Sequence, residues 1–378
     1  MTDNFKLTPW EVEGKIDYNR LIEKFGTSKV TDELKEELRL KTKSKKLHQF
    51  FRRNFIYSHR DFDKILKNIN NNNFFVYTGR GPSGKMHIGH LISFMTAKWF
   101  QDEFGCNVYI MLSDDEKFAV KKNLTLEDVK KQGDLDFEEI AAIGFDPDKT
   151  FFFSNIEYIQ HLYKKALLFG KKTTLSTAKA VFGFTNDSNL AHIFYPNIQI
   201  VPTIFEKKYC LIPAGIDQDP YWRIQRDIAE RIGYKKVTAV HNKLLAPLEG
   251  VDGKMSSSNQ SSAILLSDTP EQVKKKINKF AFSGGKPTLE EHRKLGGNPD
   301  IDVSYNWLKI IFEEDDNKLK EIHDNYKSGK MTSGEMKAYL IKKINAFLEN
   351  HRKNKEKNKK LIEKYKYTGK LAKEMWKQ

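Results

Sequence analysis

Hydrophobic and polar positions follow two patterns along this chain. Compact apolar runs, rich in aromatic and β-branched residues and bounded by polar ones, predict buried strands at residues 74–78, 106–112, 150–153 and 209–214. After the first run, Leu91, Met95 and Trp99 recur every four residues, which predicts a helix, and residues 124–143 are also predicted to be helical. Strand and helix therefore alternate, which is typical of an α/β fold with parallel strands joined by crossover helices.

The pattern of hydrophobic positions changes near residue 268, after a stretch rich in serine and asparagine, and only helical patterns follow. The sequence Thr332-Ser333-Gly334-Glu335 has the capping-box pattern that begins a helix. The apolar face of that helix is formed by Met336, Leu340, Ile344, Phe347 and Leu348. We therefore expect three parts: an N-terminal extension (residues 1–70), an α/β part (residues 71–267) and an α-helical part (residues 268–378).

The composition limits the classes of protein to consider. Hydrophobic residues make up 39 % of the 378 residues, and no run of 18 apolar residues is present that would span a membrane. The N-terminus lacks the apolar stretch of a signal peptide. Both cysteines, Cys106 and Cys210, lie in apolar runs, which excludes a disulfide framework and fits a reducing compartment. We expect a cytoplasmic protein with no membrane partner.

The formal net charge of +15 is unevenly distributed. Residues 351–378 contain eleven Lys or Arg against three Asp or Glu, so +8 of the +15 lies in these last 28 residues. Lys353, Lys357, Lys360 and Lys364 recur there at helical spacing. The distribution favours contact with a nucleic acid, and a solvated charged helix is the alternative.

The turn after the first of these strands, from Gly79 to His90, reads GRGPSGKMHIGH. Its first seven letters resemble a phosphate-binding P-loop, G-x-x-x-x-G-K-[ST]. However, Pro82 has no N–H to offer a phosphate, and Met86 stands where the loop needs a hydroxyl group for Mg²⁺. The pattern therefore argues against a P-loop.

His87 and His90 are the alternative phosphate ligands in this turn. They lie three residues apart at the predicted start of a helix, so they share a face where free N–H groups and the helix dipole favour an anion. Gly89 between them lets a flat base approach the backbone. A metal site is another interpretation, but no third ligand follows at a suitable spacing. A histidine pair that serves only the helix is a further one.

A second motif, GVDGKMSSS, lies at the end of the α/β part. Its two glycines and three serines predict a flexible loop on which Lys254 can swing onto a phosphate and Met255 can anchor the chain. A solvated Ser-rich linker is the alternative for this stretch alone. The order of the two motifs, one after the first strand and one at the end of the α/β part, makes the pair specific.

The two motifs resemble the HIGH and KMSKS signatures of class I aminoacyl-tRNA synthetases, in which the histidines and the lysine stabilise the triphosphate as an amino acid attacks the α-phosphate. The closer resemblance is to eukaryotic cytosolic tryptophanyl-tRNA synthetases, and it runs nearly end to end. It is carried by residues 8–12 (TPWEV), 77–83 (YTGRGPS), 113–117 (SDDEK), 182–184 (FGF), 216–221 (IDQDPY) and 281–285 (AFSGG).

The resemblance implies a Rossmann-type catalytic domain over residues 71–267 and an α-helical tRNA anticodon-binding domain over residues 268–378. It implies a homodimeric enzyme that joins L-tryptophan to ATP, with Mg²⁺ accompanying the ATP, releases pyrophosphate and transfers the amino acid to tRNA(Trp). A tyrosyl-tRNA synthetase and a catalytically silent RNA-binding or signalling paralogue are the alternatives.

Applied to this sequence, the resemblance implies that His87, His90 and Lys254 are catalytic. It implies no metal ion that is held by protein side chains. The residues expected at the ATP are Thr78, Gly79, Arg80, His87, Gly89, His90, Lys254, Met255 and Ser256. Those expected at the tryptophan are Tyr77, Met111, Glu116, Lys117, Gln199 and Gln218. Tyr77 would face the indole, Lys117 the carboxylate, and Glu116 with the two glutamines the ammonium group.

The sequence departs from the family pattern at three places. Relatives usually have Gln where this chain has Met111, as a second partner for the indole nitrogen, so Tyr77 is expected to act without that partner. The turn before His87 is one residue shorter than in many relatives. Relatives often carry Arg-Asp after Ser-Gly-Gly, whereas this chain has Lys286-Pro287, so the anticodon contacts do not transfer directly.

Overall fold

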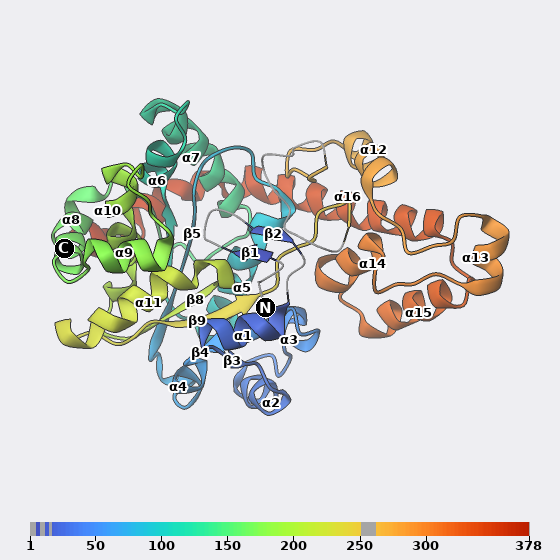
Figure 1. The fold of residues 1–378 in the computed structure, drawn as a ribbon, viewed down its shortest axis with the longest axis horizontal. Coiled ribbons are helices and arrows are strands. Elements are labelled where there is room, and N and C mark those ends of the chain that lie inside the picture. The colour runs from blue at the N-terminus through green and yellow to red at the C-terminus, as the bar shows by residue number, and fades with distance from the viewer. Residues whose placement is uncertain (1–4, 8–11, 15–16, 251–261, 378) are drawn as a thin grey trace.

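The structure is a computed structural model that describes residues 5–7, 12–14, 17–250 and 262–377. A seven-stranded sheet in the order β3-β4-β9-β8-β5-β6-β7 forms its centre, with helices around it (Figure 1). Strands β9, β8, β5, β6 and β7 are parallel, and β4 and β3 extend one edge in antiparallel fashion. The strands are β3 (Ser28–Lys29), β4 (Ile56–Arg60), β5 (Phe74–Arg80), β6 (Val108–Leu112), β7 (Thr150–Ser154), β8 (Tyr209–Gly215) and β9 (Thr238–Asn242).

The predicted α/β architecture is confirmed, because the four predicted strands correspond to β5, β6, β7 and β8. Strand β5 shows why the sheet is buried on both faces. Phe74 and Val76 pack into the hydrophobic core on one face, whereas Phe75 and Tyr77 pack into the core on the other. Alternate side chains of a strand point to opposite faces, so an apolar run of this kind needs a layer of helices on each side.

Helices of the sheet-containing part connect and cover these strands. They are α1 (Tyr18–Phe25), α2 (Asp32–Lys41), α3 (Gln49–Arg52), α4 (Phe62–Leu66), α5 (Leu91–Phe104), α6 (Asp114–Val120), α7 (Leu126–Ala141), α8 (Ile159–Gly170), α9 (Leu175–Phe182), α10 (Leu190–Gln199) and α11 (Asp219–Ile228). A separate antiparallel pair is formed by β1 (Phe5–Leu7) and β2 (Val12–Gly14). No helix within the described residues is both long and apolar enough to cross a membrane.

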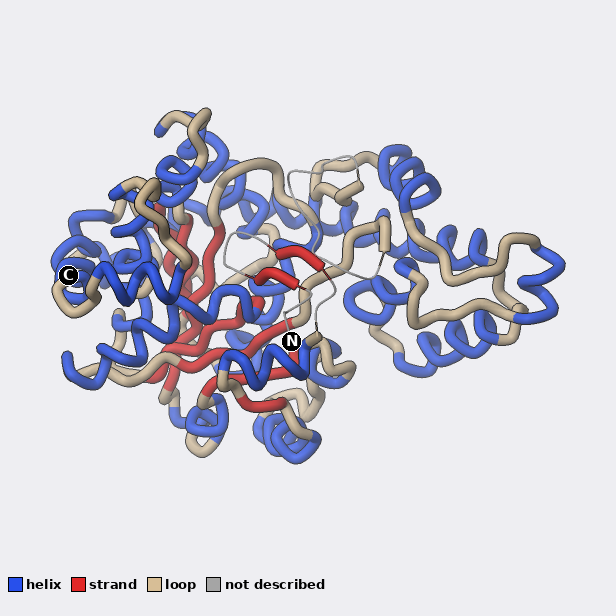
Figure 2. The backbone as a smooth tube through the Cα atoms, viewed as in Figure 1, coloured by secondary structure: helices blue, strands red, loops and turns tan. Residues whose placement is uncertain are grey.

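Among the described residues after 268, the structure has helices and loops but no strand, as the sequence predicts (Figure 2). The helices are α12 (Pro270–Phe280), α13 (Leu289–Leu295), α14 (Val303–Trp307), α15 (Asp316–Lys327), α16 (Ser333–Asn358) and α17 (Lys370–Trp376). Helix α16 begins at the predicted capping box: the Thr332 hydroxyl accepts the N–H of Glu335, and the Glu335 carboxylate accepts the N–H of Thr332.

The C-terminal end of the chain returns to the sheet. Helix α16 runs out of the helical part towards α7, where His351 and Lys355 both bond Glu139, at 2.7 and 2.6 Å (Figure 1). Further on, the hydroxyl of the buried Tyr365 donates to the carbonyl of Phe145 at 2.7 Å, and α17 packs against β7. At the other end of the chain, β3 and β4 complete the sheet. The division at residues 70 and 267 therefore stays a proposal.

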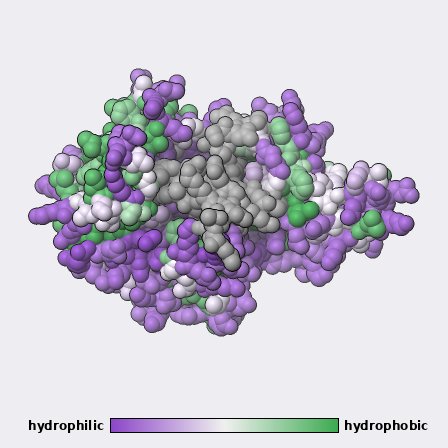
Figure 3. Space-filling view, in the orientation of Figure 1, coloured by the Kyte–Doolittle hydropathy of each residue, from purple (hydrophilic) through white to green (hydrophobic). Residues whose placement is uncertain are grey.

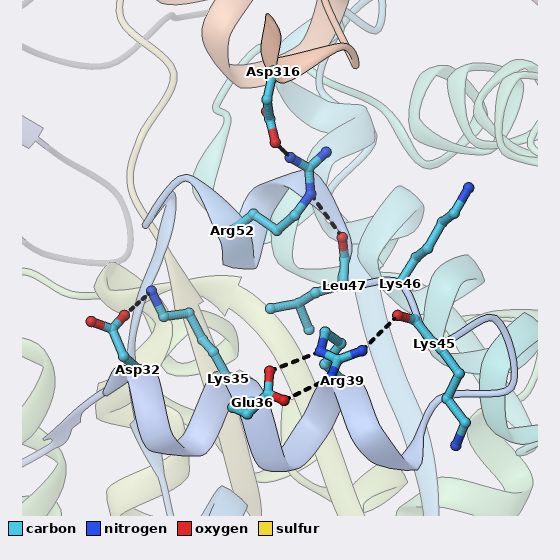
Figure 4. A pocket seen from close by; sticks show the side chains of 9 residues that line it. All are labelled: Asp32, Lys35, Glu36, Arg39, Lys45, Lys46, Leu47, Arg52 and Asp316. Atoms are coloured by element: carbon cyan, nitrogen blue, oxygen red, sulfur yellow. Dashed lines mark hydrogen bonds and ion pairs between the residues drawn. The ribbon is translucent and has the colours of Figure 1, made fainter.

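Paired charges join the helical part to the N-terminal segment. Arg52 of α3 bonds Asp316, which begins α15, and a cavity of about 610 Å³ lies beside this contact (Figure 4). The neighbouring Arg53 donates to the carbonyl oxygens of Lys309 and Glu313, at 2.6 and 2.5 Å. Other cations around the cavity are also engaged, as Arg39 is with Glu36. Arg52 and Arg53 therefore join the two parts of the chain, whereas the Arg39–Glu36 pair lies within α2.

Candidate active site

A cavity of about 300 Å³ opens at the carboxyl ends of β5, β6, β8 and β9. This is the edge at which open α/β sheets bind ligands. The predicted residues that line it are Tyr77, Thr78, Gly79, Arg80, Gly89, His90, Met111, Glu116, Lys117, Gln199 and Gln218. The fold thus gathers at one place residues that lie up to 141 positions apart in the sequence, from Tyr77 to Gln218.

Tyr77 is buried in the middle of β5. Its hydroxyl donates to the backbone carbonyl of Gln199 at 2.9 Å and lies 3.1 Å from the sulfur of Met111. Burial raises the pKa of this phenol well above its usual value, so the hydroxyl stays protonated at physiological pH. With its proton directed at Gln199, the hydroxyl oxygen retains lone pairs that can accept an N–H from a ligand.

The polar side of the cavity is rich in acceptors. Glu116 accepts the hydroxyl of Ser113 at 2.9 Å and pairs with the ammonium of Lys117 at 3.0 Å. Across the cavity, the amide of Gln218 donates to Asp217 at 3.1 Å. Two carboxylates and neighbouring amide oxygens can hold an ammonium group, which requires acceptors on several sides.

The turn that follows β5 depends on a glycine for the placement of Lys117. A Cβ atom at Gly81 would lie 1.9 Å from Cε of Lys117, so any other residue there would displace the lysine stem. Glycine at this position therefore lets Lys117 pass over the turn and bring its ammonium group to the cavity and to Glu116. The arrangement places a cation on the wall of the cavity, where it pairs with Glu116.

The two histidines share one face, as their spacing predicts. Their rings stack with centroids 3.5 Å apart, and the backbone N–H of His87 donates to Nδ1 of His90 at 3.0 Å. Since Nδ1 is the acceptor, a neutral His90 carries its proton on Nε2 and can donate it to a phosphate oxygen. His90 lines the cavity, whereas His87 is buried with 3 % of its surface exposed.

Arg80 is oriented by partners within the protein that the sequence does not predict. Its Nε donates to Asp136 of α7 at 2.6 Å, and another of its nitrogens bonds the carbonyl of Gly84. Gln132 donates to the same aspartate at 2.9 Å. The guanidinium therefore holds the glycine turn against α7, and a direct contact of Arg80 with ATP stays a prediction.

Comparison with known proteins relates this geometry to a family. A family model described as tRNA synthetases class I (W and Y) matches residues 69–349. The tryptophan–tRNA ligase of Pyrococcus abyssi is 56 % identical over 377 residues, which cover 100 % of this chain and 97 % of that protein. The one of Saccharolobus solfataricus is 54 % identical and is covered to 99 %. The chain belongs to the tryptophanyl-tRNA synthetases.

Solved structures of tryptophanyl-tRNA synthetases agree with this assignment. The enzyme from Plasmodium falciparum superposes with a TM-score of 0.87 at 41 % identity, covering 94 % of this chain and 99 % of the other. The one from Encephalitozoon cuniculi, solved with bound tryptophan, gives a TM-score of 0.83 at 34 % identity, covering 93 % and 100 %. The predicted membership in the tryptophanyl-tRNA synthetases and the class I fold are thereby confirmed, without the eukaryotic cytosolic subtype.

The sequence analysis missed several residues that line the cavity of this tryptophanyl-tRNA synthetase. Trp222 is 98 % buried and meets the ring of Tyr77 edge-on, with centroids 6.2 Å apart, and Tyr195 and Tyr221 add two further aromatic walls. Tyr221 and Trp222 follow the segment IDQDP directly. Tyr221 and Trp222 could have been identified as two adjacent aromatic residues at the start of the helix that follows the strand at residues 209–214.

The second motif falls mostly beyond the part of the chain that the structure describes, and this includes Lys254, Met255 and Ser256. Described residues on either side of it lie at this cavity or beside the turn that carries the two histidines. Leu244 lines the cavity. After the motif, the carbonyl of Ile264 accepts the N–H of Ile88 at 3.1 Å, and the N–H of Leu266 donates to Met86 at 3.0 Å. The chain on both sides of the motif is therefore held next to the two histidines.

Proposed function

We propose that this chain activates L-tryptophan with ATP, releases pyrophosphate and transfers the tryptophanyl group to tRNA(Trp). The observation that carries the proposal is a single cavity that combines an aromatic slot ending at Tyr77, acceptors for an ammonium group around Glu116, and His90 at its far side. The full-length similarity to tryptophan–tRNA ligases supports it.

In this proposal each group of side chains has one task. Tyr77 accepts the indole N–H while Met111 and the aromatic walls enclose the ring. Glu116, Gln199 and Gln218 hold the ammonium group, so the carboxylate, near Lys117, is directed at the α-phosphate. The groups proposed to contact ATP are Thr78, Gly79, Arg80, His87, Gly89, His90, Lys254, Met255 and Ser256. Of these, His87, His90 and Lys254 stabilise the charge that develops on the phosphates as the bond to pyrophosphate breaks.

We also propose that Mg²⁺ enters with the ATP. Within residues 5–7, 12–14, 17–250 and 262–377, no group of three His, Cys, Asp or Glu side chains is arranged to hold a metal ion. In proteins, Mg²⁺ usually keeps several waters and is bound through substrate phosphates and one or two carboxylates.

Pyrophosphate exchange tests the function and separates it from the alternatives. The purified chain is incubated with ATP, Mg²⁺ and labelled pyrophosphate, with tryptophan or tyrosine as the amino acid. Exchange that depends on tryptophan supports the proposal. Exchange that depends on tyrosine would indicate a tyrosyl-tRNA synthetase, and absence of exchange with both would indicate a silent paralogue.

The C-terminal lysines are proposed to contact tRNA, although several other cations of this region are already paired. Lys355 and Lys359 bond the acidic residues Glu139 and Glu138 of α7, at 2.6 and 2.8 Å. Lys357, Lys360 and Lys364 are exposed. Lys353 is also exposed but pairs with Glu349 at 2.6 Å, so of the four predicted lysines these three are the candidates for a phosphate backbone.

Changing Lys357, Lys360 and Lys364 together to alanine is expected to weaken tRNA binding and to reduce its salt dependence. Each lost phosphate contact should lower the slope of log affinity against log salt by about one. Filter binding at several salt concentrations measures this, and tryptophan-dependent pyrophosphate exchange should not change. Arginine at the same positions is the matched control, because it keeps the charge. Equal slopes for the alanine and arginine variants would favour a solvated helix.

A homodimer is proposed from an apolar surface over α6 to α10 (Figure 3). Helix α8 contributes Ile159, Tyr163, Leu167 and Leu168, all between 36 and 51 % exposed. The first three recur every four residues, so they form one stripe. Single exposed apolar residues are ordinary, but a continuous apolar surface is typical of a protein interface.

Changing Tyr163 and Leu167 to aspartate is expected to convert the dimer into a monomer, because two charges would be buried at the interface. Sedimentation equilibrium should then give the mass of one chain, 44.0 kDa. Leu295→Asp is the matched control: Leu295 is 63 % exposed in α13, far from α8 in the helical part. A dimer that survives the double change would contradict the placement of the interface, and a monomeric unmodified protein would contradict the homodimer.

Three finer assignments remain proposals. A eukaryotic cytosolic subtype is supported by the sequence segments quoted above and by the likeness to the Plasmodium and Encephalitozoon structures, while the curated relatives described are from Pyrococcus and Saccharolobus. A cytoplasmic location is supported by the two free, buried cysteines. An anticodon-binding role for residues 268–378 is supported by the helical architecture of that region.

A further inference from the structure

A buried ion pair connects the N-terminal segment to the start of α11. Arg60, the last residue of β4, donates from Nε to one oxygen of Asp219 at 2.8 Å and from Nη2 to the other at 2.7 Å. The side chain of Asp219 is fully buried and that of Arg60 is 11 % exposed. This bidentate geometry fixes the carboxylate in orientation as well as in distance.

Asp219 occupies a position from which it controls part of the cavity. It is the first residue of α11 and follows Gln218 directly. Gln218 lines the cavity, as do Tyr221 and Trp222 in the first turn of the helix. Any shift of the helix start would therefore move an ammonium ligand and two aromatic walls together.

The positive charge that compensates Asp219 comes from Arg60. His241 also faces this aspartate, but its Nε2 lies 3.9 Å away, and its Nδ1 is 2.9 Å from the hydroxyl of Ser58. Burial lowers the pKa of His241 to about 4, so the ring is neutral at physiological pH. A buried carboxylate that loses its cation is costly, and the surrounding chain must move to rehydrate it.

Arg60 extends its contacts to α1 as well. It donates to the carbonyl of Phe25 at 2.7 Å, at the end of that helix. From the beginning of the same helix, the hydroxyl of Tyr18 accepts the N–H of Leu244, which lines the cavity, at 3.0 Å. The N-terminal segment thus reaches the walls of the cavity by two routes.

We propose that Arg60 is a positioning residue of the tryptophan site, and that it acts through Asp219 to fix Gln218, Tyr221 and Trp222. The inference rests on the proposed function, because it assumes that these three residues contact tryptophan. It makes residues 17–60 a working part of the amino-acid site rather than an appended segment. ATP contacts are made from other elements of the cavity and should be affected less.

The chain provides a matched control for this proposal. The next residue, Asp61, pairs with Arg226 at 2.8 Å, and Arg226 lies in the last turn of the same helix α11. The two ion pairs join the same two segments of the chain, one at the cavity end of α11 and one at the opposite end. If docking of α11 as a whole governed the tryptophan site, loss of either pair would affect it, whereas a positioning role belongs to the pair at the cavity end.

The experiment measures tryptophan-dependent pyrophosphate exchange for Arg60→Met, Arg60→Lys and Asp61→Asn, with rates normalised to titrated active sites. Arg60→Met is expected to raise KM for tryptophan roughly tenfold or more, since small displacements of binding groups have effects of this size. KM for ATP should stay close to its original value. Arg60→Lys should give an intermediate KM for tryptophan, because it keeps the charge but loses the fork. Asp61→Asn should leave both KM values unchanged.

Two results would overturn the proposal. One is an equal increase of KM for tryptophan in Asp61→Asn, which would show that general docking of α11 is responsible. The other is an unchanged KM for tryptophan in both Arg60 variants, or in Arg60→Lys alone if Arg60→Met does not fold. Failure of the proposed function is distinguishable, because the unmodified protein would then show no tryptophan-dependent exchange.

Discussion

Changing Lys254 to alanine is expected to slow the formation of tryptophanyl adenylate by about 10²–10³-fold. Tryptophan binding should hardly change, because the lysine is proposed to meet the phosphates and not the amino acid. A cation that meets the phosphates contributes most when negative charge increases on the leaving pyrophosphate, so its loss raises the barrier and not the dissociation constant. Single-turnover kinetics of adenylate formation measure the first quantity, and equilibrium titration with tryptophan measures the second.

The described residues on both sides of the loop support this expectation. Residues 264–266 hydrogen-bond to residues 86–88, so the chain leaves the loop next to the histidine turn. Leu244 contacts the cavity before the loop begins. The described residues on both sides thus lie near His90, in agreement with the proposal that Lys254 and His90 act on the same phosphates.

Lys85→Ala is the control that decides between the two phosphate motifs. Lys85 is the lysine that a P-loop would use, but it is exposed and belongs to the glycine turn rather than to the serine-rich loop. It should tolerate alanine with little loss of adenylate formation. If Lys85→Ala abolished the reaction and Lys254→Ala left it intact, the P-loop interpretation would be correct and the assignment of the second motif wrong.

The sequence predicts those parts of the fold whose side-chain pattern is set by burial. Strand β5 is recognisable because Phe74 to Val76 must be apolar to fill the cores on both faces of the sheet. Helix α16 is recognisable because its capping box and its apolar face follow from local rules. The two histidines could be paired from their spacing alone, since positions three apart share a face.

Strands β4 and β9 could not be predicted in this way. Strand β4 contains Ser58 and His59, and β9 contains His241 and Asn242, all of them buried polar residues that interrupt an apolar run. Ser58 and His241 are partners of one another, 2.9 Å apart, although they lie 183 positions apart in the sequence. A pattern read along the chain does not reveal such partners. The contact of Arg60 with Asp219, 159 positions away, was missed for the same reason.

Changing Tyr77 to phenylalanine is expected to weaken tryptophan binding by about 1–3 kcal/mol, the usual cost of leaving a buried donor without its acceptor. The indole N–H would lose the phenolic oxygen, and the carbonyl of Gln199 would lose the proton that it now accepts at 2.9 Å. Isothermal titration with tryptophan measures the effect. The aromatic ring remains in place, so the packing of the slot is retained.

A substitution at Met111 is expected to recover part of the tryptophan-binding energy that Tyr77→Phe loses. Its sulfur lies 3.1 Å from the Tyr77 hydroxyl and can make a favourable contact with an aromatic ligand, worth roughly 0.3–1.5 kcal/mol. A glutamine at this position would add an amide oxygen that can accept the indole N–H. Met111→Gln should therefore leave tryptophan binding intact or improve it, and it should reduce the defect caused by Tyr77→Phe.

A double-mutant cycle on the Kd of tryptophan, with tyrosine as the control ligand, tests whether Tyr77 and Met111 share the indole nitrogen. The two side chains are in contact, so coupling is expected, and neighbours of this kind typically show interaction energies of about 0.5–3 kcal/mol. Strictly additive changes would show that the two residues do not act on the same atom.

Tyrosine has one ring and would leave part of the slot unfilled, which costs packing energy, and its hydroxyl lies elsewhere than the indole N–H. Tyrosine should therefore bind more weakly than tryptophan to every variant, and tighter binding of tyrosine by the unmodified protein would overturn the assignment of this slot to tryptophan.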